Sequence, residues 1–201
     1  MVHIYIYTES DNVKVHNGGT YVHSFEFSGS SGDWVYNHSF SPVLDGDMGK
    51  AMMIFQAGEN YADYAKTLNN NTPIDFCNFK YPSGLNANQY SNGTVYINNE
   101  TPFNSSHPQT YAAWDLLGHE YGHHVQNVFN LCNNPGGRHS IPSNNIDDQY
   151  TNNGGIYSLE QSKDRGHRLS WAEGWPTFWS TVAQSHFSTD LKTINTVGDT
   201  R

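Results

Sequence analysis

The stretch that decides how this chain folds reads Gly118-His119-Glu120-Tyr121-Gly122-His123-His124. On an α-helix of about 3.6 residues per turn, His119 and His123 project from the same face, so both imidazoles can reach one metal ion. Glu120 lies about 100° around the helix axis from His119. Its carboxylate can therefore reach a water molecule on such an ion without being a ligand, which is the placement that a general base requires.

A helix from Thr110 to Phe129 is predicted without reference to the two histidines. Its apolar and semi-apolar side chains recur with the period of a helix, so they would form one stripe that faces the core. This stripe consists of Leu117, Tyr121, His124, Val125 and Val128. The two histidines fall on another stripe, which would face the metal. Gly118 and Gly122 each cost about 1 kcal/mol relative to alanine inside a helix, which indicates that another backbone or a substrate passes close to them.

The HExxH spacing is that of zinc hydrolases, but it also arises by chance in a chain with 11 histidines. The alternative is an amphipathic helix whose histidines are solvated or hydrogen-bonded. A catalytic zinc ion needs three protein ligands and an open position for water, so a third ligand would favour the metal site. The longer pattern HExxHxxGxxH is excluded, because the chain has Gln126 and Phe129 where it requires glycine and histidine. The downstream candidates are His139, Asp147, Asp148, Glu160, His167 and Glu173.

Glu173 is the preferred third ligand because it stands in an aromatic segment, Ser170-Trp171-Ala172-Glu173-Gly174-Trp175-Pro176. A carboxylate among these tryptophans is unfavourable unless it is paired. The alternative is a capping box, since Ser170 and Glu173 also fit the S-x-x-E pattern in which the glutamate bonds back to the first turn. Both interpretations predict that a helix starts here, at Ser170 or closer to Pro176.

The pairing of HExxH with a later Glu-Gly-aromatic segment resembles the gluzincin metallopeptidases, whose third zinc ligand is a glutamate on a helix. The resemblance implies a zincin-like fold with Zn²⁺ on His119, His123 and Glu173. It also implies that Glu120 is the general base. Only these two segments of the chain carry the resemblance.

The chain departs from the gluzincin pattern at two points. The distance from His123 to Glu173 is 173 − 123 = 50 positions, longer than in the thermolysin-like and aminopeptidase groups, so an enlarged loop is expected between the two helices. Position 177, where thermolysin-like enzymes have an aspartate that supports a histidine, carries Thr177. The support of a histidine is therefore expected from another residue, and Asp115 is the candidate.

The composition predicts one domain, because 201 residues with 36% hydrophobic content can bury one core. The formal net charge of −9 argues against nucleic acid or an anionic membrane as a partner. Charged residues make up only 14% of the chain, whereas Asn, Ser, Thr, Gly and Tyr are abundant. Such a composition, poor in charged and rich in uncharged polar residues, is typical of extracellular proteins. No apolar run approaches the ~20 residues of a membrane-spanning helix, and no signal peptide is visible. We expect a fragment of a longer secreted or cell-surface protein.

The expected fold class is α+β, a single zincin-like domain spanning residues 1–201. Its β-rich N-terminal part covers about residues 1–45 and its metal-site part about residues 94–190. An irregular excursion is expected over residues 130–166, which are rich in Asn, Gly, Pro, Ser and Asp. The expected strands are His3–Tyr7, Tyr21–Phe27, Asp33–Tyr36, Ile74–Phe79 and Thr94–Asn98, and the other expected helices are Asp47–Leu68 and Thr177–His186.

Two local features of the sequence each allow two structural interpretations. By analogy with gluzincins, Val95-Tyr96-Ile97 would be an edge strand that lines the cleft and pairs with an extended peptide; the alternative is an ordinary internal strand. Cys77 and Cys132 could form one disulfide bridge in an oxidising compartment, or remain two buried thiols.

The expected function is zinc-dependent hydrolysis of a peptide bond in a peptide or protein substrate. Gluzincins add a tyrosine or histidine that stabilises the tetrahedral oxyanion, and the loop offers several candidates. These candidates are Tyr150, Tyr157, His139 and His167. One rival is a non-catalytic extracellular binding or adhesion domain with a structural zinc site, although such a site has no use for Glu120. The other rival is a zinc hydrolase that cleaves a non-peptide amide or an ester.

Overall fold

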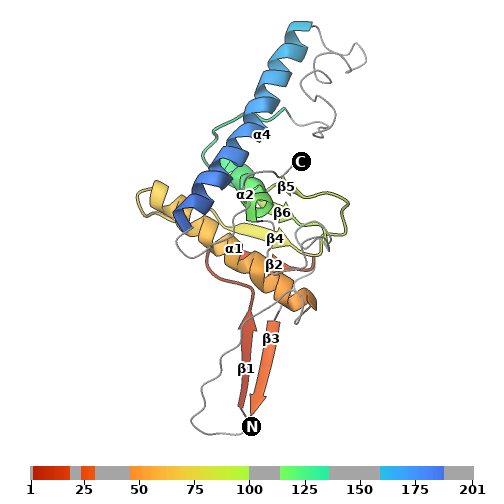
Figure 1. Cartoon of the computed structure of the whole chain (residues 1–201), viewed down its shortest axis with the longest axis vertical. Helices are drawn as coiled ribbons and strands as arrows, with labels where there is room; N and C mark the ends of the chain where they lie inside the picture. Colours follow the sequence, from red (N-terminus) through yellow and green to blue (C-terminus); the bar gives the residue numbers. More distant parts are fainter. Residues whose placement is uncertain (1, 19–23, 30–45, 100–113, 136–158, 188–201) are drawn as a thin grey trace.

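The computed structural model of this 201-residue chain describes residues 2–18, 24–29, 46–99, 114–135 and 159–187. Across these residues the chain has a mixed α/β fold, with a four-stranded sheet, a separate two-stranded ribbon and three helices (Figure 1). None of the helices in the described ranges combines the length and the apolar character needed to cross a membrane.

A two-stranded ribbon extends away from the body of the molecule (Figure 1). It pairs β1 (Val2–Tyr7) with β3 (Ser24–Gly29) in antiparallel orientation. The strand expected at His3–Tyr7 is confirmed, and β3 confirms the described part of the strand expected at Tyr21–Phe27. The strand expected at Asp33–Tyr36 lies outside the described residues.

The four-stranded sheet has the order β2-β4-β6-β5. Its strands are β2 (Val13–His16), β4 (Cys77–Lys80), β6 (Thr94–Tyr96) and β5 (Gln89–Ser91). The first three are parallel, whereas β5 runs antiparallel to β6. The β5–β6 hairpin turns at Asn92-Gly93, where both residues have positive φ, as a two-residue type I′ turn requires.

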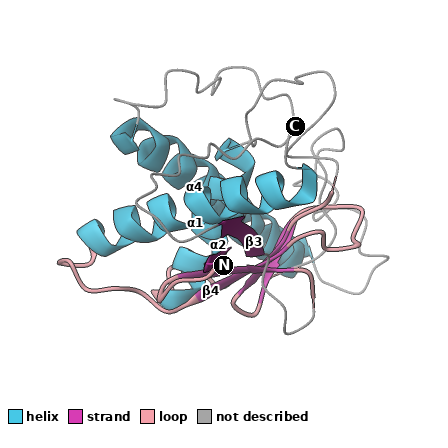
Figure 2. Ribbon diagram, turned by 90° about the horizontal axis from the view of Figure 1, so that it is seen from below, coloured by secondary structure: helices cyan, strands magenta, loops and turns pink. Residues whose placement is uncertain are grey.

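One face of this sheet carries the core. Residues alternate between buried and half-buried along β2 and β4, so Val15 and Phe79, which are paired in register, both point to the covered face. Helix α1 (Gly46–Leu68) packs there through Gly58, where an added Cβ would lie 2.8 Å from Val13 and 3.0 Å from Phe79. Most of the helical ribbon lies on one side of the strands (Figure 2). The helix expected at Asp47–Leu68 is therefore confirmed.

Helix α2 (Trp114–Val128) lies between the sheet and the long helix α4 (Leu159–Phe187). Tyr121 of α2 stacks on Phe79 of β4 on one side and on Trp179 of α4 on the other, with ring centroids 6.3 and 5.8 Å apart. The apolar stripe expected on α2 is confirmed, because its first four members are buried and Val128 is half-buried.

The expected start of the second metal-binding helix is wrong. Helix α4 begins at Leu159, so residues 159–166 are helical instead of belonging to the expected irregular excursion. This segment has no apolar stripe, but Leu, Glu, Gln, Lys and Arg are strong helix formers, and Asp164 pairs with Arg168 at 2.8 Å. The capping-box interpretation of Glu173 is also wrong, because Ser170 lies inside the helix and donates to the carbonyl oxygen of Gly166.

The structure decides two alternatives that the sequence left open. β6 is an internal strand, paired with β4 on one side and β5 on the other, so the edge strand next to α2 is β5 and not Val95-Tyr96-Ile97. Cys77 and Cys132 are free thiols. Cys77 is completely buried in β4, and this burial raises the pKa of its thiol.

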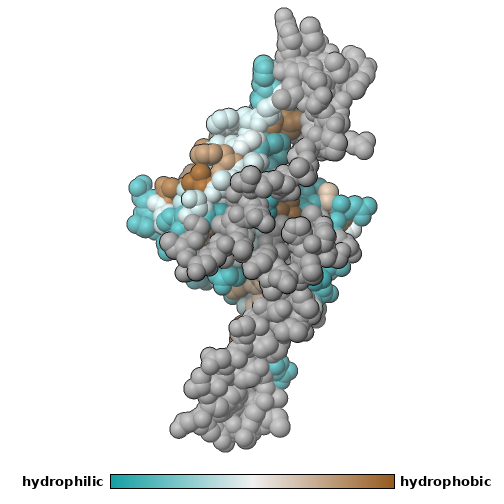
Figure 3. Space-filling view, viewed as in Figure 1, coloured by the Kyte–Doolittle hydropathy of each residue, from teal (hydrophilic) through white to brown (hydrophobic). Residues whose placement is uncertain are grey.

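Helix α4 has two unlike faces. Its inner face meets α2 and α1 through buried side chains such as Trp179 and Ala183. Its outer face exposes Trp171 and Phe178, which are 55% and 65% accessible, and the space-filling view shows hydrophobic residues along this helix (Figure 3).

Candidate metal centre

The contact between α2 and α4 brings the candidate ligands together. A Cβ added at Gly122 would lie 2.9 Å from the Cα of Pro176, so the missing side chain allows the two backbones to approach closely. One turn earlier, Gly118 faces the side chains of Ser180 and Tyr61. The prediction that another backbone passes close to these glycines is confirmed for Gly122.

Buried polar contacts fix the start of α2 against its neighbours. The hydroxyl of Tyr61 on α1 donates to the carbonyl oxygen of Trp114. The hydroxyl of Ser180 on α4 donates to the carbonyl oxygen of Asp115 at 2.9 Å and accepts from the amide of Gln184. Because these partners come from both other helices, the rotation of α2 relative to α4 is set by specific contacts as well as by apolar packing.

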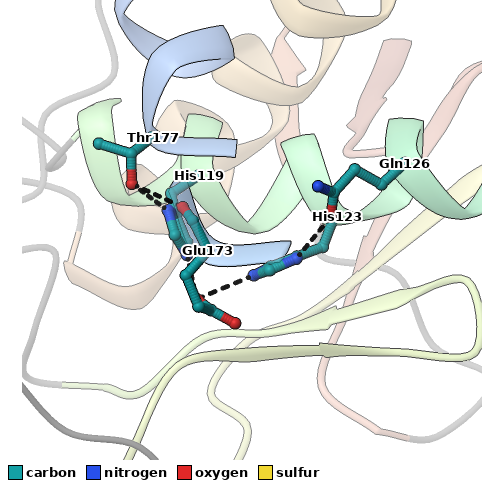
Figure 4. Close-up of polar contacts among 5 residues, drawn as sticks. All are labelled: His119, His123, Gln126, Glu173 and Thr177. Carbon is teal, nitrogen blue, oxygen red and sulfur yellow. Dashed lines mark hydrogen bonds and ion pairs between the residues drawn. The ribbon is translucent and has the colours of Figure 1, made fainter. Parts of the chain in front are cut away.

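Three ligand atoms converge across this helix pair (Figure 4). Oε2 of Glu173 on α4 lies 3.2 Å from Nε2 of His119 and 3.5 Å from Nε2 of His123 on α2. His119, His123 and Glu173 form a group whose ligand atoms all lie within 4.8 Å of one another, and this group could hold a metal ion. In a tetrahedral site with zinc–ligand bonds of 2.0–2.1 Å, neighbouring ligand atoms would be about 3.3 Å apart. The separations of Oε2 from both imidazoles are close to that value.

The other ring nitrogen of each histidine has a partner that fixes its proton. Thr177 donates its hydroxyl hydrogen to the carbonyl oxygen of Glu173, so its oxygen accepts from Nδ1 of His119 at 3.0 Å. Oε1 of Gln126 lies 3.3 Å from Nδ1 of His123 and can only accept. With the proton on Nδ1, each neutral imidazole presents a lone pair at Nε2. Two lone pairs then face a carboxylate oxygen, an arrangement that a cation would stabilise.

The electrostatics of the group also favour positive charge. Burial disfavours the charged imidazolium of His123, but the hydrogen bond and charge of Glu173, together with the charge of Glu120, raise its pKa above the ordinary value. Both histidine side chains are nearly covered, whereas the Glu173 side chain is 25% exposed. Solvent can therefore reach the carboxylate side of the group.

Glu120 is buried on α2 between the two histidines in sequence, and it is not one of the three converging ligands. The negative charge of Glu120 contributes to the raised pKa of the His123 imidazole. Neighbouring His124 belongs to the core: its Nε2 donates to the carbonyl oxygen of Asp75 at 2.8 Å, and burial lowers the pKa of its imidazole. Of the three histidines of the motif, only the two with HExxH spacing face Glu173.

The support of a histidine was expected from a residue other than Thr177, and this expectation is wrong for His119. Asp115 contributes its backbone carbonyl to Ser180, whereas Thr177, at the position where thermolysin-like enzymes have aspartate, contacts His119. Gln126, whose side chain contacts His123, was not predicted from the sequence. Its spacing of three residues after His123 on a helix was the signal that could have found it.

The remaining candidates do not join this group in the described part of the chain. His167 lies on the exposed side of α4, nearly two turns before Glu173. Glu160 lies at the start of α4, far along the helix from Glu173. The other candidates fall outside the described residues: His139, Asp147, Asp148, Tyr150 and Tyr157.

A comparison of the chain with protein-family models, with curated proteins and with solved structures finds no match. Two imidazole nitrogens and one carboxylate oxygen can bind a divalent metal, and a second carboxylate, Glu120, follows His119 on the same helix.

Proposed function

We propose that this chain is a zinc-dependent peptide hydrolase with a zincin-like fold, in which His119, His123 and Glu173 hold Zn²⁺. The observation that carries the proposal is the convergence of their Nε2, Nε2 and Oε2 atoms across α2 and α4. Two imidazoles and one carboxylate are a donor set of catalytic zinc sites, which keep a fourth position for water. The partial exposure of Glu173 is consistent with access of water to that position.

Each residue of the site has a separate task in this proposal. Bound at these atoms, zinc supplies a Lewis acid that lowers the pKa of water and polarises a carbonyl group. Glu120 accepts a proton from the attacking water and returns it to the leaving amine. Thr177 keeps His119 in the tautomer whose Nε2 can bind metal. We propose that one of four candidates stabilises the oxyanion: Tyr150, Tyr157, His139 or His167.

The position of β5 supports a peptide as the substrate. β5 is the edge of the described sheet on the side of α2, and Tyr90 of β5 contacts His124 of α2 through its hydroxyl and its ring. An extended peptide can pair with such an edge through its backbone, as strand addition requires. We therefore propose that the strand addition expected at Val95-Tyr96-Ile97 takes place at β5.

Two other functions would use the same residues differently. A binding or adhesion domain with a structural zinc site would be expected to surround the metal with four protein ligands, whereas three converge among the residues that the structure describes. It would also have no use for a buried carboxylate at Glu120.

A hydrolase of non-peptide amides or esters would use the same metal and base, and only its substrate would distinguish it from a peptide hydrolase. The low content of charged residues supports an extracellular or cell-surface location.

The substitution Glu120→Gln tests the proposal. We expect the wild type to bind about one zinc ion per chain, because the described residues form one such group. We also expect it to cleave members of an unbiased peptide library. The variant should bind zinc with unchanged affinity but lose on the order of 10²–10⁴-fold in kcat, because it lacks the general base.

Metal content is measured by elemental analysis, cleavage by mass spectrometry, and folding by circular dichroism. A panel of esters and non-peptide amides is assayed in parallel. A wild type that binds no zinc would exclude the metal site, and full activity of the variant would exclude Glu120 as the base. Cleavage of the ester panel alone would favour the second rival function.

A further inference from the structure

Gln126 occupies an unusual position for an amide side chain. It lies one turn after His123 on α2, and it is only 4% exposed. Its backbone is also fixed, because its carbonyl oxygen accepts from the backbone N–H of Leu131 at 2.9 Å where α2 ends. The backbone of Gln126 is therefore fixed by a hydrogen bond, and its side chain is fixed by its burial in the core.

The two polar atoms of this amide have different environments. Oε1 lies 3.3 Å from Nδ1 of His123, whereas Nε2 is buried with no hydrogen-bond partner among the described residues. A buried N–H without a partner destabilises the folded state. An apolar side chain of the same length would avoid this penalty, so fold stability alone does not explain a glutamine here.

We propose that Gln126 is a positioning residue for the metal ligand His123. Its oxygen holds the proton of that imidazole on Nδ1 and so directs the Nε2 lone pair to the metal. This inference rests on the metal site proposed above. Histidines that bind metal almost always donate their other N–H to such a partner, and loss of the partner typically lowers metal affinity or activity about 10–100-fold. Because Gln126 is buried, water cannot readily replace its oxygen.

The test compares zinc affinity and stability in matched variants. Gln126→Met keeps the length of the side chain but removes the acceptor, whereas Gln126→Glu keeps an acceptor. Gln184→Met is the control, because Gln184 on α4 is also buried and also has one atom without a partner, but it donates to Ser180. Zinc affinity is measured by competition with a chromophoric chelator, and the Tm of the metal-free proteins is measured in parallel.

We expect Gln126→Met to bind zinc about 10–100-fold more weakly, while the Tm of its metal-free form stays equal to that of the wild type or rises. Gln126→Glu should keep wild-type affinity or exceed it, and Gln184→Met should keep it while lowering the Tm. A purely structural role predicts the reverse for Gln126→Met: a lower Tm with unchanged zinc affinity. That result would overturn the inference.

A measurement on the wild type removes any dependence on how the variant folds. In the zinc-loaded protein, ¹⁵N NMR should show His123 with a protonated Nδ1 and a metal-bound Nε2. A metal-bound Nδ1 would refute the inference even if zinc binds. A wild type that binds no zinc in the chelator assay would instead refute the proposed metal site, so the two failures can be distinguished.

Discussion

The inner and outer faces of α4 differ in what their residues contact. On the inner side, Glu173 and Thr177 meet the histidines of α2, and Pro176 lies against Gly122. On the outer side, a Cβ added at Gly174 would meet nothing within 4 Å, and Phe178 is 65% exposed. The comparison indicates that the site depends on where a residue lies around the helix, and matched substitutions on the two faces can test this.

The largest effect is expected for Glu173→Ala. It removes one of the three proposed ligands, so zinc affinity should fall by more than the roughly 100-fold upper value typical for the loss of a supporting partner. The control is Asp164→Ala, which removes an exposed carboxylate from the same helix. It should leave zinc affinity unchanged and alter the free energy of unfolding by less than about 1 kcal/mol. If zinc binds equally well to Glu173→Ala, the third ligand lies elsewhere, and His139 or Asp147 becomes the next candidate.

A smaller effect is expected from a methyl group placed between the two helices. Gly122→Ala would force the backbone at Pro176 to move, which should destabilise the fold by about 1–3 kcal/mol and weaken zinc binding by displacing Glu173. Gly174→Ala adds the same methyl group on the outer face, where it should stabilise α4 by up to about 1 kcal/mol. Chemical denaturation of the metal-free proteins measures both values. Equal stability of the two variants would contradict the close contact of α2 and α4.

The smallest effect is expected for Thr177→Val, which removes the hydroxyl that accepts from His119. Zinc affinity should fall about 10-fold, the lower end of the usual range for such partners, because Thr177 is exposed and water can partly replace its oxygen. Thr181→Val is the control, since Thr181 makes the same bond to the carbonyl four residues earlier but contacts no ligand. Chelator competition should separate the two variants. An equal loss in both would show that the threonines act only through the helix.

Much of α2 and its two histidines could be predicted from the sequence, because the relevant spacing is local. The apolar stripe fixes which face packs on the sheet, and the positions of His119 and His123 follow from the helical period. The helix α1 and its end were also predictable, because Asn70 and Asn71 adopt the positive φ that terminates helices. The start of α4 was not, since residues 159–166 have helix propensity but no apolar period. The edge position of β5 was also out of reach, because strand order depends on long-range pairing.

By itself, the sequence determined that two imidazoles and the Glu120 carboxylate share one helix, since helix geometry relates residues four apart without any other part of the chain. Only the tertiary structure decided which of the acidic and histidine candidates meets them and that Thr177 contacts His119. The physical reason is that these contacts cross between α2 and α4. Their register depends on how closely Gly122 and Pro176 allow two backbones to approach, and no pattern within either helix encodes that distance.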